Sequence, residues 1–201
     1  MMTTHTFSNS DKNGPKSPLA KSQQKPRYDA LYKTLHWVVA VLMILMLLAK
    51  FGFASAITQD DKITMLIGHS SIGTVLTFFI LLRLVKRFVI KSERPVQGIS
   101  DWQKKVSHLV HMALYFCLIM IPLTGYLTAN LHQLPVMPFT LFNLSQASGV
   151  SFNEANFLFM RGVHETFING LIALLVIHIG AALFHKFIKK DTVMSSMTPG
   201  K

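Results

Sequence analysis

Four long apolar segments, separated by polar stretches, dominate the pattern of the chain. They cover residues 35–53, 63–85, 106–128 and 163–184. Each has about 19–23 residues, and an α-helix needs about 20 to cross the bilayer core. Stretches such as VVAVLMILMLLA lack the polar face that helices of soluble bundles show. Because helices pair their backbone groups internally, as lipid requires, the pattern predicts an all-α integral membrane four-helix bundle.

The polar stretches divide the chain further. Residues 1–27 are rich in Ser, Thr, Asn, Lys and Pro without an apolar period, so we expect a flexible cytoplasmic tail. Residues 28–190 hold the predicted four-helix domain, and residues 191–201 form a C-terminal tail. The connection at 129–162 is long and partly apolar, and we expect it to fold as a cap on the outer surface.

The distribution of charge indicates the orientation of the bundle. The chain has 20 Lys and Arg against 9 Asp and Glu, yet 50% of its residues are hydrophobic and only 14% are charged. Soluble domains, including nucleic-acid binders, carry about 25% charged residues, so a nucleic-acid partner is not expected. Seventeen basic residues lie in the N-terminal flank, the second connection and the C-terminal end; the others are Lys50, Lys62 and Arg161. The positive-inside rule therefore places both termini in the cytoplasm.

Four of the nine histidines fall within the apolar segments, where ionisable groups are costly and usually functional. They are His36 in the first segment, His69 in the second, and His164 and His178 in the fourth. His178 follows His164 by 14 positions, which places both on nearly one helix face, about 21 Å apart along the axis. His36 matches His178 in depth near the cytoplasm, and His69 matches His164 near the outer surface.

Paired histidines at two depths of a four-helix bundle indicate two stacked haems, since bundle cores bind haem and histidine is a common axial ligand. We predict an inner haem between His36 and His178, and an outer haem between His69 and His164. A hydrogen-bonded helix contact is the alternative for any single histidine. One zinc or copper site is disfavoured because the two levels lie about 21 Å apart. The single cysteine, Cys117, excludes a disulfide within the chain and a c-type haem attachment.

Further polar residues lie near the predicted inner haem. Arg83 follows His69 by 14 positions and so returns to the same helix face one haem level deeper. There it either pairs with haem propionates or snorkels to the cytoplasmic surface. His108 and His111 lie three positions apart on one face of the third segment. Both can hydrogen-bond a propionate or a quinone, or serve as interfacial polar residues; we expect the first role for His108 and favour the interfacial role for His111.

The chain resembles the bacterial cytochrome b561 family over residues 28–190. The resemblance rests on His36-Trp37 and on the segments HSSIGTVLTFFILLRL, HLVHMALYFCLIMIPLTGYL and VHETFINGLIALLVIHIGAALFHKF. It implies a multi-pass protein of the bacterial inner membrane that binds two haem b groups and exchanges electrons with ubiquinone. It also places the axial ligands on the four residues His36, His69, His164 and His178.

Some members of that family oxidise superoxide at the periplasmic side, so the resemblance implies a quinone-linked oxidoreductase with superoxide or another periplasmic donor. Arg161, one turn before His164, is the candidate catalytic residue because positive charge at the outer mouth attracts an anion. Anchoring at the lipid headgroups is the alternative for Arg161. Two other functions stay open: an electron-transfer anchor for a larger dehydrogenase or hydrogenase, and a haem-free channel or transporter.

Overall fold

The computed structural model describes residues 29–89, 100–145, 147, 149, 151–191, 193–194 and 196–197. They form four long helices, α1 (Ala30–Ser55), α2 (Gln59–Phe88), α3 (Asp101–Asn130) and α4 (Glu154–Phe184). The 3₁₀ turn η1 (Pro138–Thr140) lies between α3 and α4, and the π-helical turn η2 (His185–Lys189) ends α4. All four long helices have the length and apolar character needed to cross a membrane, which confirms the predicted fold. The predicted tail at 1–27 lies outside the described residues.

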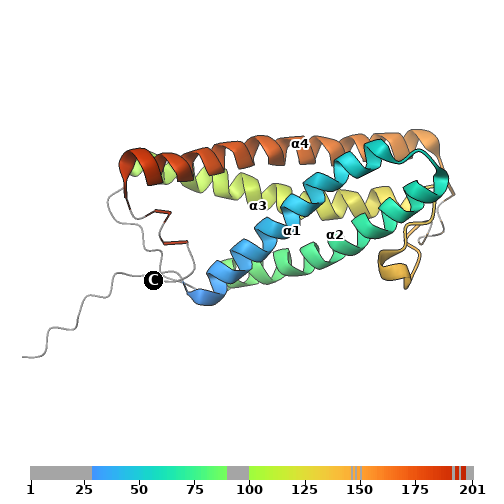
Figure 1. The fold of residues 1–201 in the computed structure, drawn as a ribbon, viewed down its shortest axis with the longest axis horizontal. Helices are drawn as coiled ribbons and strands as arrows, with labels where there is room; N and C mark the ends of the chain where they lie inside the picture. Colours follow the sequence, from blue (N-terminus) through green and yellow to red (C-terminus); the bar gives the residue numbers. More distant parts are fainter. Residues whose placement is uncertain are drawn as a thin grey trace, which may run out of the picture.

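The four helices run alternately up and down the bundle (Figure 1). α1 packs along α2 and α3 packs along α4, whereas α2 and α3 touch over a shorter stretch. Among the described residues, no Cα atom of α1 lies within 8 Å of one in α4, so only side chains bridge these two helices. The α1–α2 and α3–α4 connections lie at one end of the bundle, and the positive-inside rule makes the opposite end cytoplasmic (Figure 1).

Polar caps make the helices longer than the apolar segments that predicted them. α1 begins after Asp29, whose carboxylate accepts a backbone N–H of the first turn. Thr58 is the N-cap of α2 and forms a capping box with Asp61, in which each side chain accepts the backbone N–H of the other residue. α4 begins at Glu154, after the cap Asn153, whereas the apolar pattern placed its start near residue 163. The first N–H groups of a helix have no partner within the helix, and each cap accepts a hydrogen bond from one of them. Capping therefore allows the helices to extend past the apolar segments.

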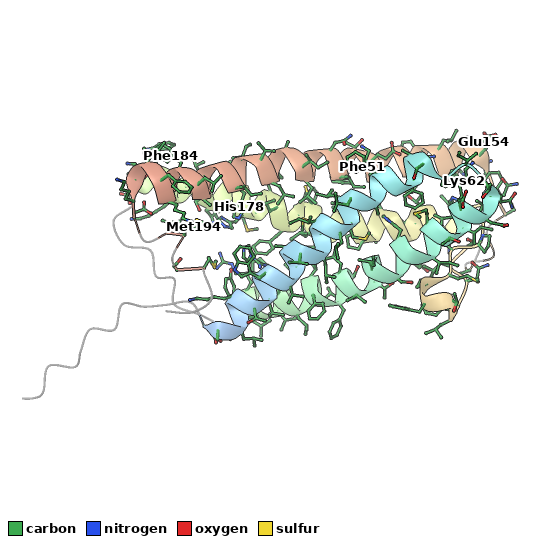
Figure 2. All side chains as sticks on the ribbon, in the orientation of Figure 1. Phe51, Lys62, Glu154, His178, Phe184 and Met194 are labelled. Carbon is green, nitrogen blue, oxygen red and sulfur yellow. The ribbon has the colours of Figure 1, made fainter. Side chains whose placement is uncertain are left out.

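The outside of the bundle is apolar. Phe51 is 73% exposed and Val176 is 67% exposed, and large apolar side chains are exposed on all four long helices (Figure 2). In water, a continuous surface of this kind would drive association, so it is suited to lipid. Lys62 and Glu154 mark the outer end of the bundle, while His178 lies toward the cytoplasmic end (Figure 2).

A small apolar core occupies the middle of the bundle. Its buried members are Val39 and Met43 of α1, Leu76 and Ile80 of α2, Leu114, Tyr115, Cys117 and Leu118 of α3, and Leu171 of α4. Leu171 lies seven positions from both His164 and His178, which is about 10 Å along the helix in each direction. The core therefore separates the two histidine levels and limits the entry of water between them.

The α3–α4 connection folds back against α2 at the outer end, as Figure 1 shows for η1. The Phe139 N–H donates a hydrogen bond to the Ser71 Oγ at 2.7 Å. Asn130, which is buried at the end of α3, donates to the Leu144 carbonyl at 3.3 Å. This connection is thus a cap on the outer surface, in agreement with the sequence prediction.

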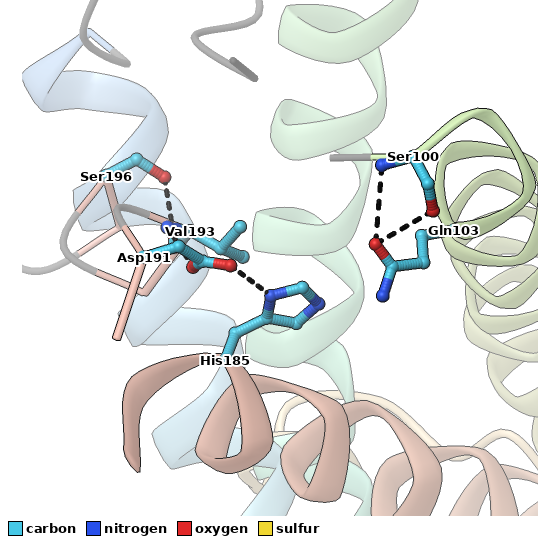
Figure 3. Close-up of polar contacts among 6 residues, drawn as sticks. All are labelled: Ser100, Gln103, His185, Asp191, Val193 and Ser196. Atoms are coloured by element: carbon cyan, nitrogen blue, oxygen red, sulfur yellow. Dashed lines mark hydrogen bonds and ion pairs between the residues drawn. The ribbon is translucent and has the colours of Figure 1, made fainter. Parts of the chain in front are cut away.

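The C-terminal segment returns across the cytoplasmic end toward α1. The Trp37 Nε1–H donates to the Met197 carbonyl at 3.0 Å. The His185 Nδ1 hydrogen-bonds to the Asp191 carboxylate at the turn that leaves η2 (Figure 3). The sequence predicted a simple tail here. These contacts instead hold the C-terminal segment against the first and the last helix.

Two further polar contacts order the helix ends on this side. Asp29 and Lys86 form an ion pair of 2.6 Å, which joins the start of α1 to the end of α2. The Lys86 ammonium beside Asp29 holds the pKa of that carboxyl below its usual range. At the start of α3, the Ser100 hydroxyl donates to the Gln103 Oε1 at 3.0 Å (Figure 3).

Candidate functional site

The structure brings the four membrane histidines together in two pairs. His36 of α1 and His178 of α4 lie next to each other toward the cytoplasmic end, with ring centres 6.3 Å apart and ring planes at 69°. His69 of α2 and His164 of α4 meet nearer the outer end, with ring centres 6.5 Å apart. These are the pairs that depth along the helices indicated, and each pair spans from the α1–α2 hairpin to α4.

The ring spacing fits one metal ion between the two rings of each pair. With metal–nitrogen bonds of about 2.0 Å and ring centres roughly 1.2 Å behind each nitrogen, two imidazoles on one ion have centres about 6.4 Å apart. Both observed spacings lie close to this value. Within the described ranges, no group of three or more His, Cys, Asp or Glu side chains is arranged to hold an ion. A histidine pair suits the axial positions of a haem, whose porphyrin supplies the remaining ligands.

Arg83 of α2 lies beside the inner histidine pair. It is only 7% exposed, and its Nη1 donates to the His36 Nδ1 at 2.7 Å. Its guanidinium lies 5.5 Å from the ring centre of Tyr32 and 5.9 Å from that of Tyr115. No carboxylate of the described residues forms an ion pair with Arg83. A buried cation without an anion is costly, so this position suits an anionic group.

A third histidine contacts the inner pair. The ring centre of His111 on α3 lies 5.2 Å from that of His178, with the ring planes at 88°. His108, one turn earlier, is exposed. Of the two alternatives for His111, the structure favours contact with the inner site over the interfacial role, because the rotation of α3 turns His111 inward. Its distance of three and seven positions from the buried Leu114 and Leu118 was the available sequence signal for that face.

The outer pair rests on α3. The His164 ring lies against Gly125, where an added Cβ would come within 3.1 Å of the His164 Cε1. The buried Thr124 places its Oγ1 3.0 Å from the His164 Nδ1. On the other side, the Phe53 ring of α1 meets the His69 ring edge-on, with centres 5.5 Å apart. All four helices therefore contribute to the outer site, as they do to the inner one.

Each histidine pair is accompanied by a buried nitrogen without a hydrogen-bond partner. In the part of the chain that the structure describes, two such side-chain atoms occur, the His69 Nδ1 and the Arg83 Nε. A buried polar atom without a partner costs free energy, and such atoms are few in folded proteins. Their location at the two histidine levels, one at each, fits sites that hold a polar cofactor.

Arg161 lies at the outer end of α4, one turn before His164. Its Nε donates to the Glu165 carboxylate at 3.0 Å, and both side chains are more than half exposed. The structure thus places Arg161 near the outer pair but sets a negative charge beside it. Its contribution to the attraction of an anion is reduced by that pairing and depends on ionic strength.

Comparison with known proteins agrees with this geometry. A family model described as prokaryotic cytochrome b561 matches residues 27–200. The chain is 26% identical to cytochrome b561 homolog 1 of Escherichia coli (strain K12) over 167 residues, which are 82% of this chain and 93% of that protein. It is 25% identical to cytochrome b561 homolog 2 of the same organism over 174 residues, which are 85% of this chain and 90% of that protein.

Proposed function

Because the chain belongs to the prokaryotic cytochrome b561 family, membrane b-type cytochromes of electron transport, we propose that it binds two haem b groups and transfers electrons between a periplasmic donor and ubiquinone. The observation that carries this proposal is the pair of facing histidines at each of two depths. The four spanning helices and the family make the chain a multi-pass protein of the bacterial inner membrane.

The proposed ligands are His36 and His178 for the inner haem, and His69 and His164 for the outer haem. Because the His36 Nδ1 accepts from Arg83, the proton of that ring is on Nε2, so binding of the inner haem by His36 requires Arg83 to release this nitrogen. When bound, each haem supplies a one-electron carrier. Two histidine ligands at each haem would favour electron transfer over the binding of oxygen. Arg83 is the proposed partner of an inner propionate, since its guanidinium is buried without a carboxylate of the described residues beside it.

Binding of a propionate or quinone by His108 stays a prediction. His108 is exposed near the cytoplasmic start of α3, whereas His111 reaches the inner pair. An exposed imidazole at this depth would meet a quinone head group that approaches from the lipid. His111 would instead contact the inner site from within the bundle.

Superoxide is the proposed donor on the periplasmic side. Two superoxide anions would give up one electron each and become dioxygen, while one ubiquinone takes up both electrons and two protons to become ubiquinol. Reduction of the quinone thus requires proton uptake, whereas oxidation of superoxide releases none. The chain would conduct single electrons from the outer level to the inner one.

Anaerobic spectroscopy tests the proposed function directly. Purified protein is expected to contain about two haems per chain and to show a reduced b-type spectrum after addition of a short-chain ubiquinol. Superoxide generated in the absence of quinol should reduce the same chromophore. A folded protein without colour would contradict the proposal and favour the haem-free channel, and copurification of a large redox enzyme would favour the anchor function.

Charge substitutions at the outer end test the superoxide donor. Arg161→Gln is expected to slow haem reduction by superoxide about two- to tenfold at low ionic strength, because it removes positive charge from the outer mouth. Glu165→Gln, which frees Arg161 from its ion pair, is expected to speed the same reaction. Stopped-flow measurement at low and high salt checks both, since the differences should shrink with screening. Equal rates for both variants and the unmodified protein would rule out this role for Arg161.

A further inference from the structure

The hydroxyl of Thr124 has two kinds of neighbour. Its Oγ1 lies 2.7 Å from the Met120 carbonyl and 3.0 Å from the His164 Nδ1. A hydroxyl carries one proton, and a carbonyl only accepts, so the short bond to Met120 uses that proton. The contact with His164 is then made by the ring, whose Nδ1–H donates to the Thr124 oxygen. The Ile121 backbone carbonyl is a second acceptor for the same hydroxyl, at 3.1 Å.

This donor arrangement assigns the tautomer of His164. With the proton on Nδ1, the lone pair of the ring is on Nε2, which is the nitrogen available to a metal. A hydrogen bond from the second nitrogen to an acceptor is the usual way in which proteins orient a metal-binding histidine and raise its basicity. Thr124 meets that requirement from α3, a helix that supplies none of the four proposed ligands.

Gly125 completes the support of the ring. A Cβ at this position would lie 3.1 Å from the His164 Cε1, closer than most side-chain contacts allow. The ring therefore packs directly on the backbone of α3 while its Nδ1 bonds to the neighbouring residue. We call Thr124 and Gly125 together the His164 seat.

The other proposed outer ligand has no such support. The His69 Nδ1 is buried without a hydrogen-bond partner among the described residues, and its ring meets Phe53. Threonines elsewhere on the helices, such as Thr77 and Thr128, donate their hydroxyl to the carbonyl four residues earlier. The seat thus acts on one ligand of the outer pair.

We propose that Thr124 is a positioning residue that holds His164 with its Nε2 toward the outer haem and thereby lowers the reduction potential of that haem. This inference rests on the proposed function. A more basic axial ligand stabilises the oxidised iron relative to the reduced iron. Without the hydroxyl, the His164 Nδ1–H would lose the acceptor that Thr124 provides.

Thr124→Val tests this role because valine keeps the shape of threonine and lacks the hydroxyl. We expect the outer haem of the variant to favour the reduced form by about tenfold, a rise of about 59 mV for a one-electron couple. The inner haem should keep its potential. Thr124→Ser retains the hydroxyl and is expected to restore the original value. An optical redox titration of the purified, haem-loaded protein measures both haems.

Thr128→Val is the matched control. Thr128 lies one turn further along α3 and donates its hydroxyl to the Thr124 carbonyl at 2.7 Å, so its removal should leave both potentials unchanged.

Gly125→Ala tests the His164 seat in another way, because the added methyl group crowds the His164 ring. It is expected to weaken retention of the outer haem about tenfold. Potentials of Thr124→Val equal to those of the unmodified two-haem protein would overturn the inference. Absence of haem from the unmodified protein would instead overturn the proposed function.

Discussion

His178→Ala is expected to lower the haem content from about two per chain to about one, and His164→Ala should do the same at the other level. The reason is geometric. Each substitution removes one of two facing rings, whose centres are 6.3 Å apart at the inner level and 6.5 Å at the outer. The apolar core around Leu171 lies between the levels, so loss of one site should leave the other intact.

Haem-to-protein ratios and redox titrations of the two variants measure this result. Each variant should retain a single redox transition, and the two retained transitions should together reproduce those of the unmodified protein. His132→Ala is a suitable control, because His132 lies in the outer connection, where its Nδ1 accepts the Leu134 N–H at 2.9 Å. An unchanged haem content in either ligand variant would contradict the assignment of that pair.

Arg83→Met is expected to have different effects on the haem-free and the haem-loaded protein. Without haem, the substitution removes a buried cation that has no anionic partner among the described residues, but it also removes the hydrogen bond to His36 and the contacts with two tyrosine rings, so stability should change little. With haem, it would leave a propionate buried without its partner, which costs about 3–5 kcal/mol. We therefore expect inner-haem affinity to fall by roughly a hundredfold or more.

The measurements are thermal unfolding of the haem-free protein and transfer of haem to an excess of a haem acceptor. Arg87→Met is the matched control, since Arg87 lies one turn further along α2 and is less buried than Arg83. Arg83→Lys should give an intermediate loss, because an ammonium keeps the charge but lacks the paired donors of a guanidinium. If Arg83→Met retained the inner haem as firmly as the unmodified protein, a snorkelling role would explain Arg83 better.

Much of the fold follows from the hydropathy pattern of single segments. The apolar runs located all four spanning helices, and the basic flanks indicated which end is cytoplasmic. The helix starts were less predictable: α4 begins at Glu154, in a stretch that the apolar pattern left to the outer connection. Polar caps such as Asn153, rather than hydropathy, decide where a helix begins outside lipid.

Part of the candidate site could also be predicted from positions along single helices. The pairing of His36 with His178, and of His69 with His164, depends on depth, and depth is proportional to position in a straight helix. The contacts that α3 makes with these histidines could not be predicted from position along a helix. His111 contacts His178, and Thr124 contacts His164, because of how α3 is rotated and how closely it packs on α4.

The sequence by itself determined that this is a four-span membrane protein, how it is oriented, and at which two depths its histidines lie. Each of these depends on the composition and spacing within one helix or its flanks. Only the tertiary structure decided that Arg83 is buried without an anion of the described residues, and that Thr124 and Gly125 support His164. Those relations depend on the packing of different helices against one another, and helix packing admits several rotations for the same apolar pattern.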